Sequence, residues 1–252
     1  MNKKVPFITL FWLAGLSMLG FLATDMYLPA FEAMQIDFAT SSANIGLTLI
    51  IFLLGMACGQ LVYGPLSDRI GRKPALLIGL SLYIVATAVC LFASNIYLLL
   101  GARLVQALGA CSAIVIWQAV VIDRYEGKLG QKMFATIMPL VALSPALAPL
   151  LGAYLLQHFD WRSIFVVLLA LGVVFVAFTL REKESLTKPA QDTKIIDKLK
   201  IDYQQVFQSK KFIGNMLIFA GCSAAFFAYL TGSPFVMSAM GYTESDIGLS
   251  YI

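Results

Sequence analysis

The sequence predicts an all-α membrane protein, in which a six-helix bundle is followed by a seventh helix and the start of an eighth. The 252 residues are 60% hydrophobic and 13% charged, with a mean hydropathy of +0.83, whereas charged residues make up about a quarter of a soluble domain. Apolar runs of the roughly 20 residues needed to cross a bilayer recur along the chain. The Lys and Arg residues fall between these runs in a strongly one-sided pattern.

The expected spans follow one another closely, with short polar connections. The first begins at Phe7, behind Lys3 and Lys4. It is too long for the apolar part of a signal peptide and has no small-residue cleavage site, so we interpret it as a retained helix. A seventh span covers about residues 212–235, and an eighth begins at Ile247. The six spans before them cover residues 7–30, 44–66, 74–93, 96–122, 132–157 and 162–181.

The distribution of basic residues predicts the orientation. If the N-terminus is cytoplasmic and the spans alternate, 16 of the 18 Lys and Arg residues are cytoplasmic, with Arg103 inside a span and Arg162 outside. Residues 1–181 then form an N-terminal six-helix half, 182–211 a charged cytoplasmic linker, and 212–252 the incomplete start of a C-terminal half. The similar heptapeptides NIGLTLI (44–50) and DIGLSYI (246–252) support a parallel repeat of two six-helix units, an arrangement known in membrane transporters.

Several function classes find no support in the sequence. His158 is the only histidine, and each of the four cysteines lies alone inside an apolar run, so we expect neither a metal site nor a bound cofactor. We find no nucleophile–base pair and no phosphate-binding loop, which argues against an enzyme and against direct ATP coupling. The basic residues form no single patch, so we expect no nucleic-acid partner. A non-transporting receptor would be favoured by large extramembrane domains, and the sequence contains none.

The segment GPLSDRIGRKPAL, residues 64–76, lies in the short cytoplasmic connection between the second and third spans. A loop that only kept its side of the membrane would need basic residues, but not this spacing of glycine, aspartate and arginine. The segment resembles the signature loop of the major facilitator superfamily, G-x-L-a-D-r-x-G-r-k. The resemblance implies a cytoplasmic latch built on a cluster of Asp68, Arg72 and Asp123; the alternative is exposed charges that contribute little. The implied latch residues are Gly64, Asp68, Arg69, Gly71, Arg72, Lys73 and Asp123.

Three other segments resemble motifs of the same superfamily. LLLGARLVQALGA (98–110) is similar to its fourth-helix motif, an intramembrane arginine followed by Q-x-x-G. ATDMYLPAF (23–31) is similar to the D-x-Y-x-P motif of its drug-exporter branch. SPALAPLLGAYL (144–155) resembles the fifth-helix motif of antiporters, G-P-x-x-G-G, although Ala148 and Ala153 stand where that motif has its first and last glycines.

The pattern as a whole resembles the Bcr/CflA drug-resistance group of this superfamily. The resemblance implies a proton-coupled secondary transporter of small organic solutes in the bacterial inner membrane, which exports drugs by proton antiport. Segments at 20–31, 116–121 and 135–152 also resemble a subgroup linked to purine nucleosides, so transport of a nucleoside or related metabolite is an alternative. Because the family has twelve helices, we expect activity to need the missing C-terminal half; an inactive truncated half-transporter is the second alternative.

Asp25 and Arg103 are the candidate proton-coupling residues. Asp25 lies about five residues from the outer end of the first span and Arg103 about seven from that of the fourth, which places both roughly 8–10 Å below the outer boundary. Opposite charges at one depth of a bundle can compensate each other, and an intramembrane carboxylate can bind and release protons. A static buried ion pair that fixes helix packing is the alternative.

A candidate substrate cavity follows from helical spacing. At about 100° per residue, Arg103, Gln106 and Trp117 share an arc of roughly 80° on the fourth span. Aromatic, methionine and amide groups together suit an amphipathic or flat-ring substrate, while lipid contact or helix packing is the alternative for the apolar side chains. The expected partners are a small-molecule substrate, protons and the lipid bilayer. The residues assigned to the cavity are Met18, Phe21, Tyr27, Gln106, Trp117 and Gln118.

Overall fold

The structure is a computed structural model, and it describes residues 6–186 and 204–240. The chain divides into two compact units, Met1–Asp192 and Thr193–Ile252. All regular structure in the described ranges is helical, and six helices are long and apolar enough to cross a membrane. The predicted all-α membrane fold is therefore confirmed. The predicted boundaries of the three parts at residues 181 and 211 stay a prediction.

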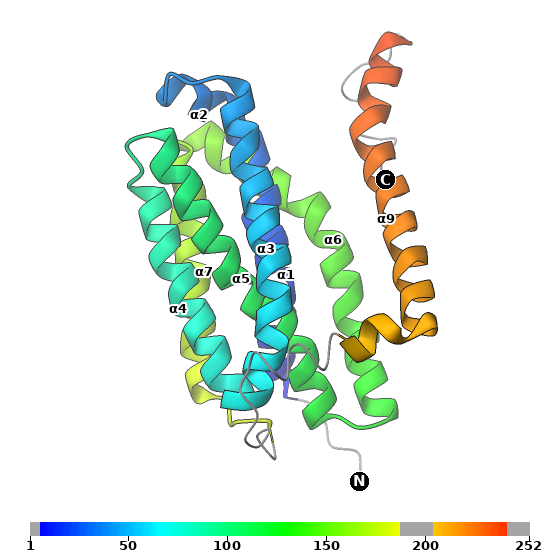
Figure 1. Cartoon of the computed structure of the whole chain (residues 1–252). Coiled ribbons are helices and arrows are strands. Elements are labelled where there is room, and N and C mark those ends of the chain that lie inside the picture. Colours follow the sequence, from blue (N-terminus) through cyan, green and yellow to red (C-terminus); the bar gives the residue numbers. More distant parts are fainter. Residues whose placement is uncertain (1–5, 187–203, 241–252) are drawn as a thin grey trace. The chain divides into compact units, whose positions relative to one another are not determined.

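The first unit is a bundle of long helices joined by short connections (Figure 1). Each predicted span from the second to the sixth corresponds to one helix, with ends that differ by a few residues. Ser41 and Asn95 cap two of these helices, because their side-chain oxygens accept hydrogen bonds from backbone N–H groups three residues later. The long helices are α1 (Phe7–Asp25), α3 (Ser42–Ile70), α4 (Arg72–Leu91), α5 (Ile96–Arg124), α6 (Lys128–His158) and α7 (Arg162–Arg181).

The first predicted span, residues 7–30, does not continue as one regular helix. α1 ends at Asp25, and a 3-10 turn, η1 (Leu28–Ala30), leads into the short α2 (Phe31–Asp37). Pro29 contributes to the break, because it has no backbone N–H to donate to the carbonyl of Asp25 one turn earlier. The break lies tightly against α6, because a Cβ at Gly152 would come within 2.1 Å of the carbonyl oxygen of Met26.

Helix α5 lies at the centre of the bundle. Its side chains pack against α1, α3 and α4, and Arg103 and Trp117 are among the largest buried side chains of the chain. α4 and α5 approach closely because Gly109 has no side chain: a Cβ there would lie 2.4 Å from the backbone nitrogen of Tyr83. The glycine of the Q-x-x-G motif thus brings together the helices that carry Gln106 and Thr87.

Helix α6 has the smallest buried share of the six membrane helices, and three prolines interrupt its backbone hydrogen bonds. A proline has no backbone N–H, so each proline inside a helix leaves one carbonyl of the preceding turn without its helical partner. The hydroxyl of Ser144 donates to the carbonyl of Val141 at 2.8 Å, which is the carbonyl that one of these prolines leaves free. The prolines inside α6 are Pro139, Pro145 and Pro149.

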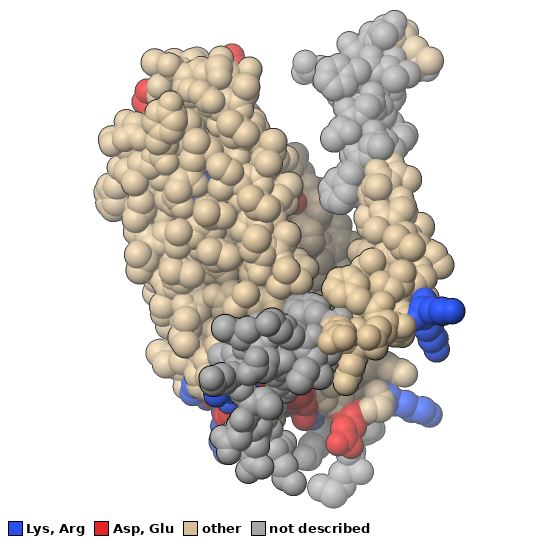
Figure 2. Space-filling view, in the orientation of Figure 1, with Lys and Arg blue, Asp and Glu red and all other residues tan. Residues whose placement is uncertain are grey.

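Polar contacts join α2 to the start of α7, at the end of the bundle opposite the signature segment. Nη1 of Arg162 lies 3.0 Å from Oδ2 of Asp37, and the indole N–H of Trp161 donates to the same oxygen at 3.1 Å. Between the two ends, the visible face of the bundle carries almost no charged side chain (Figure 2). Such an uncharged band is the surface that lipid contact requires.

The second unit contains α9 (Lys210–Ala239), a helix of 30 residues. The predicted seventh span, residues 212–235, lies within it. The predicted start of the eighth span at Ile247 lies outside the described residues, as does the part of the predicted linker at 187–203.

Candidate functional site

The signature segment forms a turn of a single residue between two helices. α3 continues to Ile70 and α4 begins at Arg72, so Gly71 alone is non-helical in the expected loop 64–76. Gly71 has φ 102° and ψ 153°, a conformation that essentially only glycine adopts. Gly64, in contrast, lies inside α3, where a Cβ would meet nothing within 4 Å. The turn therefore depends on Gly71.

The side chain of Arg72 joins the three residues of the expected latch. Its Nη1 lies 2.6 Å from Oδ1 of Asp68, which is four residues earlier and belongs to α3, and its Nε donates to Oδ2 of Asp123 at 2.8 Å. Nη1 also donates to Oγ of Ser67 at 2.7 Å. Arg72 is only 11% exposed at its side chain, and charge-assisted hydrogen bonds in such a setting are stronger than those between open surface charges. The cluster ties together the ends of α3, α4 and α5.

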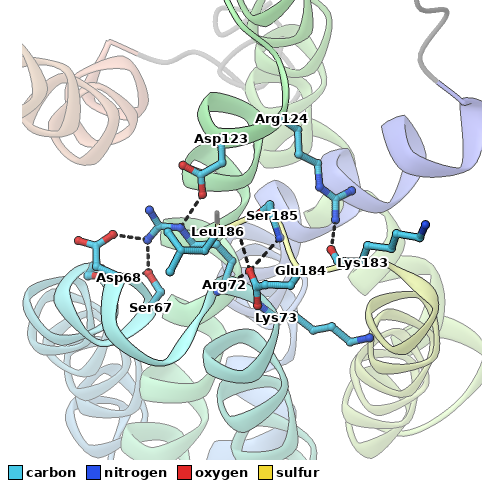
Figure 3. Close-up of polar contacts among 11 residues, drawn as sticks. Ser67, Asp68, Arg72, Lys73, Asp123, Arg124, Lys183, Glu184, Ser185 and Leu186 are labelled. Carbon is cyan, nitrogen blue, oxygen red and sulfur yellow. Dashed lines mark hydrogen bonds and ion pairs between the residues drawn. The ribbon is translucent and has the colours of Figure 1, made fainter. Parts of the chain in front are cut away.

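Residues 182–186, which follow α7 and which we call the strap, pack against the start of α4 (Figure 3). The carboxylate of Glu184 accepts hydrogen bonds from the backbone N–H groups of Arg72 and Lys73, both at 3.0 Å. It also accepts from the N–H groups of Ser185 and Leu186, at 2.8 and 2.9 Å. Partial burial acts to raise the pKa of Glu184, but these four donors outweigh it and hold the pKa below its ordinary value.

Two basic side chains fix the strap from either side. The ammonium of Lys73 donates to the carbonyls of Leu180 and Glu182, at 2.7 and 2.8 Å, and so caps the last turn of α7. Arg124, at the end of α5, pairs with the carboxylate of Glu182 at 2.5 Å and donates to the carbonyl of Lys183. The strap is therefore held to both α4 and α5.

Sequence reasoning missed four residues of the network around the signature turn. Ser67 precedes Asp68, and the i,i+5 distance to Arg72 carries no recognised motif. The other three lie in charged stretches, where the sequence does not distinguish a charged side chain that is paired from one that is solvated. They are Arg124, Glu182 and Glu184. Arg69, which the resemblance assigned to the latch, is exposed and makes no ion pair within residues 6–186.

Arg103 is fully enclosed inside the bundle. Its guanidinium lies between two aromatic rings, 4.4 Å from the ring centroid of Tyr27 and 4.1 Å from that of Phe52. Nη1 donates to the carbonyl of Ala23 at 3.0 Å and to Oε1 of Gln106 at 2.8 Å. Cation–π contacts of this kind are strongest where water is excluded. The charge of Arg103 is thus stabilised by rings and by the neutral oxygens that Nη1 reaches, whereas Nε and Nη2 are buried without a hydrogen-bond partner among the described residues.

The amide of Gln106 continues this network into α4. Its Nε2 donates to Oγ1 of Thr87 at 2.9 Å, and that hydroxyl donates to the carbonyl of Tyr83 at 2.6 Å. Gln106 and Thr87 are both fully buried, and hydrogen bonding is what makes a buried amide tolerable. A chain of polar groups therefore crosses the bundle from α1 through α5 to α4.

Asp25 is the last residue of α1 and follows, by two positions, the carbonyl that Arg103 binds. Its carboxylate makes no ion pair in the described part of the chain, and its Oδ2 is buried without a hydrogen-bond partner. The two candidate coupling residues therefore come from packed helices at similar depth, but the structure does not join them. Their roles in coupling stay a prediction.

The candidate cavity residues divide into two groups by exposure. Gln118 and Phe21 are exposed, the latter at 38%, and Met18 is half-buried. The other three are enclosed by packing within the bundle. Tyr27 contacts Arg103, and Trp117 packs on Phe134 of α6 with ring centroids 5.3 Å apart. The enclosed three are Tyr27, Gln106 and Trp117, and the assignment of all six residues to one substrate cavity stays a prediction.

Comparisons with known proteins agree with this architecture. Residues 13–252 match the family model of the Major Facilitator Superfamily. An uncharacterised MFS-type transporter of Bacillus subtilis, YdgK, is 34% identical over 229 residues, which cover 90% of this chain and 57% of the relative. A chloramphenicol resistance protein of Pseudomonas aeruginosa is 39% identical over 167 residues, covering 66% and 40%. A bicyclomycin resistance protein homolog of Haemophilus influenzae is 29% identical over 240 residues, covering 93% and 59%.

A solved transporter has the same fold. The proton:xylose symporter XylE bound to 6-bromo-6-deoxy-D-glucose superposes with a TM-score of 0.67 at 16% identity, covering 96% of this chain and 64% of that chain. At this identity the likeness concerns the fold alone. The chain spans between 40% and 59% of the length of the three curated relatives that it matches.

Proposed function

Because the chain belongs to the major facilitator superfamily, we propose that it forms part of a secondary transporter that exports drug-like organic molecules in exchange for protons. The chloramphenicol and bicyclomycin resistance proteins among its relatives support drug export. The observation that carries proton coupling is the carboxylate of Asp25, which stands at the end of a membrane helix with one oxygen buried and unpartnered. An intramembrane carboxylate without a fixed cation is free to bind a proton.

The proposed membrane is the bacterial inner membrane, with the N-terminus in the cytoplasm. The helix ends at the signature end of the bundle carry Arg72, Lys73 and Arg124, as the positive-inside rule requires of a cytoplasmic face. At the opposite end Arg162 is paired with Asp37. Because the matched relatives are longer than this chain, the complete transporter is proposed to contain a second six-helix half, with the substrate path between the halves.

Within this proposal the buried and exposed polar residues have different roles. Met18, Phe21 and Gln118 are the candidates for substrate contact, because their side chains reach the surface of the bundle. Arg103 and Gln106 are enclosed and hydrogen-bonded between helices, which supports a role in holding the site in shape. The Arg72 cluster is the proposed cytoplasmic latch.

Asp25→Asn is expected to abolish proton-coupled transport while leaving insertion and folding intact, because asparagine keeps the shape of the side chain but cannot carry the proton. The measurement is the pH change that bicyclomycin induces in proteoliposomes holding this chain together with the second half of the Haemophilus relative. Glu32→Gln, which changes an exposed acid of α2, is the matched control and should behave as the parent. Undiminished proton movement in the Asp25→Asn protein would remove Asp25 from the mechanism.

Arg72→Ala and Asp68→Asn are expected to shift the same transporter toward inward-open states and to slow turnover, with substrate affinity changed less. The reason is that each variant removes a charge-assisted bond between helix ends. Accessibility of single cysteines at the two mouths of the transporter measures the shift. Lys132→Ala, at an exposed basic residue of the same face, is the control. If all three variants are labelled like the parent, the cluster is surface charge without a latch function.

A further inference from the structure

The start of α4 uses a residue from more than 100 positions away to complete its hydrogen bonds. The first N–H groups of any helix have no partner inside it. Here the N–H of Gly71 donates to the carbonyl of Ser67, and Pro74 has no N–H to satisfy. The remaining two, on Arg72 and Lys73, both donate to the carboxylate of Glu184. Glu184 therefore supplies, from the strap, the cap that the signature segment lacks.

The signature turn also leaves the space that this carboxylate occupies. A Cβ at residue 71 would lie 2.6 Å from Oε2 and 3.1 Å from Cδ of Glu184. Gly71 thus has two separate reasons to be glycine: its backbone conformation, and the room it gives to a side chain from another part of the chain. The second reason holds only if the turn is built to receive Glu184.

We propose that Glu184 is a positioning residue of the latch, and that the strap sets the geometry of the signature turn. The carboxylate fixes the backbone of Arg72, while the side chain of Arg72 reaches Asp68 and Asp123. A negative charge at the positive end of α4 adds to the effect of the hydrogen bonds. This proposal deepens the latch role proposed above, and rests on it only for the consequence for transport.

The position of the strap couples the latch to the chain that leaves the bundle. Lys73 and Arg124 hold the strap through its carbonyls and through Glu182, so it has attachments to α4 and α5 besides Glu184. A displacement of the strap would free the two N–H groups of α4 and remove the support of the Arg72 backbone together. The segment after α7 is therefore a part of the latch, in addition to being a connection.

The test is backbone hydrogen exchange of the 252-residue chain in lipid nanodiscs, which needs no transport. Glu184→Ala is expected to speed exchange of the Arg72 and Lys73 amides by about fivefold, the factor typical for loss of one helix cap. Glu126→Ala, which removes an exposed acid from the α5–α6 connection, is the matched control and should leave these amides unchanged. Parent-like exchange in Glu184→Ala would overturn the cap itself, without bearing on proton coupling or drug export.

A second comparison separates positioning of the latch from capping alone. If Glu184 acts through Arg72, exchange at the ends of α3 and α5 should rise in Glu184→Ala as it does in Arg72→Ala, and the double variant should add little to either. If the effect stays confined to the amides of residues 72 and 73, or if the two variants are additive, Glu184 does not position the latch and the proposal fails. Glu184→Gln should fall between the parent and the alanine variant, because its amide oxygen can still accept from the N–H of Arg72, whereas its amide nitrogen cannot accept from the N–H of Lys73.

Discussion

Replacement of Gly71 by alanine is expected to unfold the signature turn, whereas the same replacement at Gly64 is expected to be harmless. With φ at 102° and ψ at 153°, a side chain at residue 71 costs about 1–3 kcal/mol from backbone strain alone. The new Cβ would also meet the Glu184 carboxylate at 2.6 Å and displace it from the start of α4. The added methyl group is therefore unfavourable for two independent reasons, backbone strain and displacement of Glu184.

The Gly64→Ala variant is the matched control, because it adds the same methyl group to the same signature segment. Residue 64 is helical with open space around it, and alanine there should gain up to about 0.5–1 kcal/mol of helix stability. The measurement is thermal unfolding of both variants in the same detergent, together with hydrogen exchange at residues 71–75. Equal stability of the two variants would show that the turn does not depend on the conformation of Gly71.

Arg103→Ala is expected to destabilise the bundle by about 3 kcal/mol or more. The substitution opens a cavity between the rings of Tyr27 and Phe52, and it leaves the buried oxygens of Ala23 and Gln106 without their donor. Arg103→Lys should fall between the parent and the alanine variant. Lysine keeps the charge but not the flat group that both rings contact.

The control for Arg103 is Arg162→Ala, because the side chain of Arg162 is 34% exposed and its ion pair with Asp37 should be worth less than about 1 kcal/mol. Unfolding temperatures measured in one detergent give the comparison. Asp25→Asn should leave the unfolding temperature unchanged, because Asp25 makes no ion pair in the described structure. If Arg103→Ala keeps its stability and loses only coupling, the main role of Arg103 lies with Asp25 and not in packing.

The fold was predictable because a bilayer leaves few choices. Backbone groups in lipid must pair within their own helix, so run length and the positions of Lys and Arg suffice to place most spans. The Arg72 cluster was predictable for a different reason. The resemblance of the signature segment implied a cluster of Asp68, Arg72 and Asp123, and the structure brings these three side chains together. The break after Asp25 escaped prediction because apolar side chains continue past Pro29.

The contacts of individual polar side chains could not be predicted. Helical spacing shows that Arg103, Gln106 and Trp117 share a face of α5, but not that α1, α4 and α6 cover this face. Depth placed Arg103 level with Asp25 and gave no sign that two aromatic rings would hold its guanidinium. The contact of Glu184 with the start of α4 joins residues 112 positions apart, and no local pattern reports such a distance.

The prolines of α6 make this helix easier to bend than α5. α5 has no proline and is enclosed by its neighbours, so its backbone hydrogen bonds are uninterrupted and resist bending. In α6, each of the three prolines between residues 139 and 149 removes one backbone hydrogen bond. The hydroxyl of Ser144 donates to one of the three carbonyls that are left free. Bending of α6 should therefore be concentrated in this stretch. Because α6 contains three internal prolines, whereas α3 contains one and α5 none, α6 is the long helix of the first unit that we expect to bend most easily.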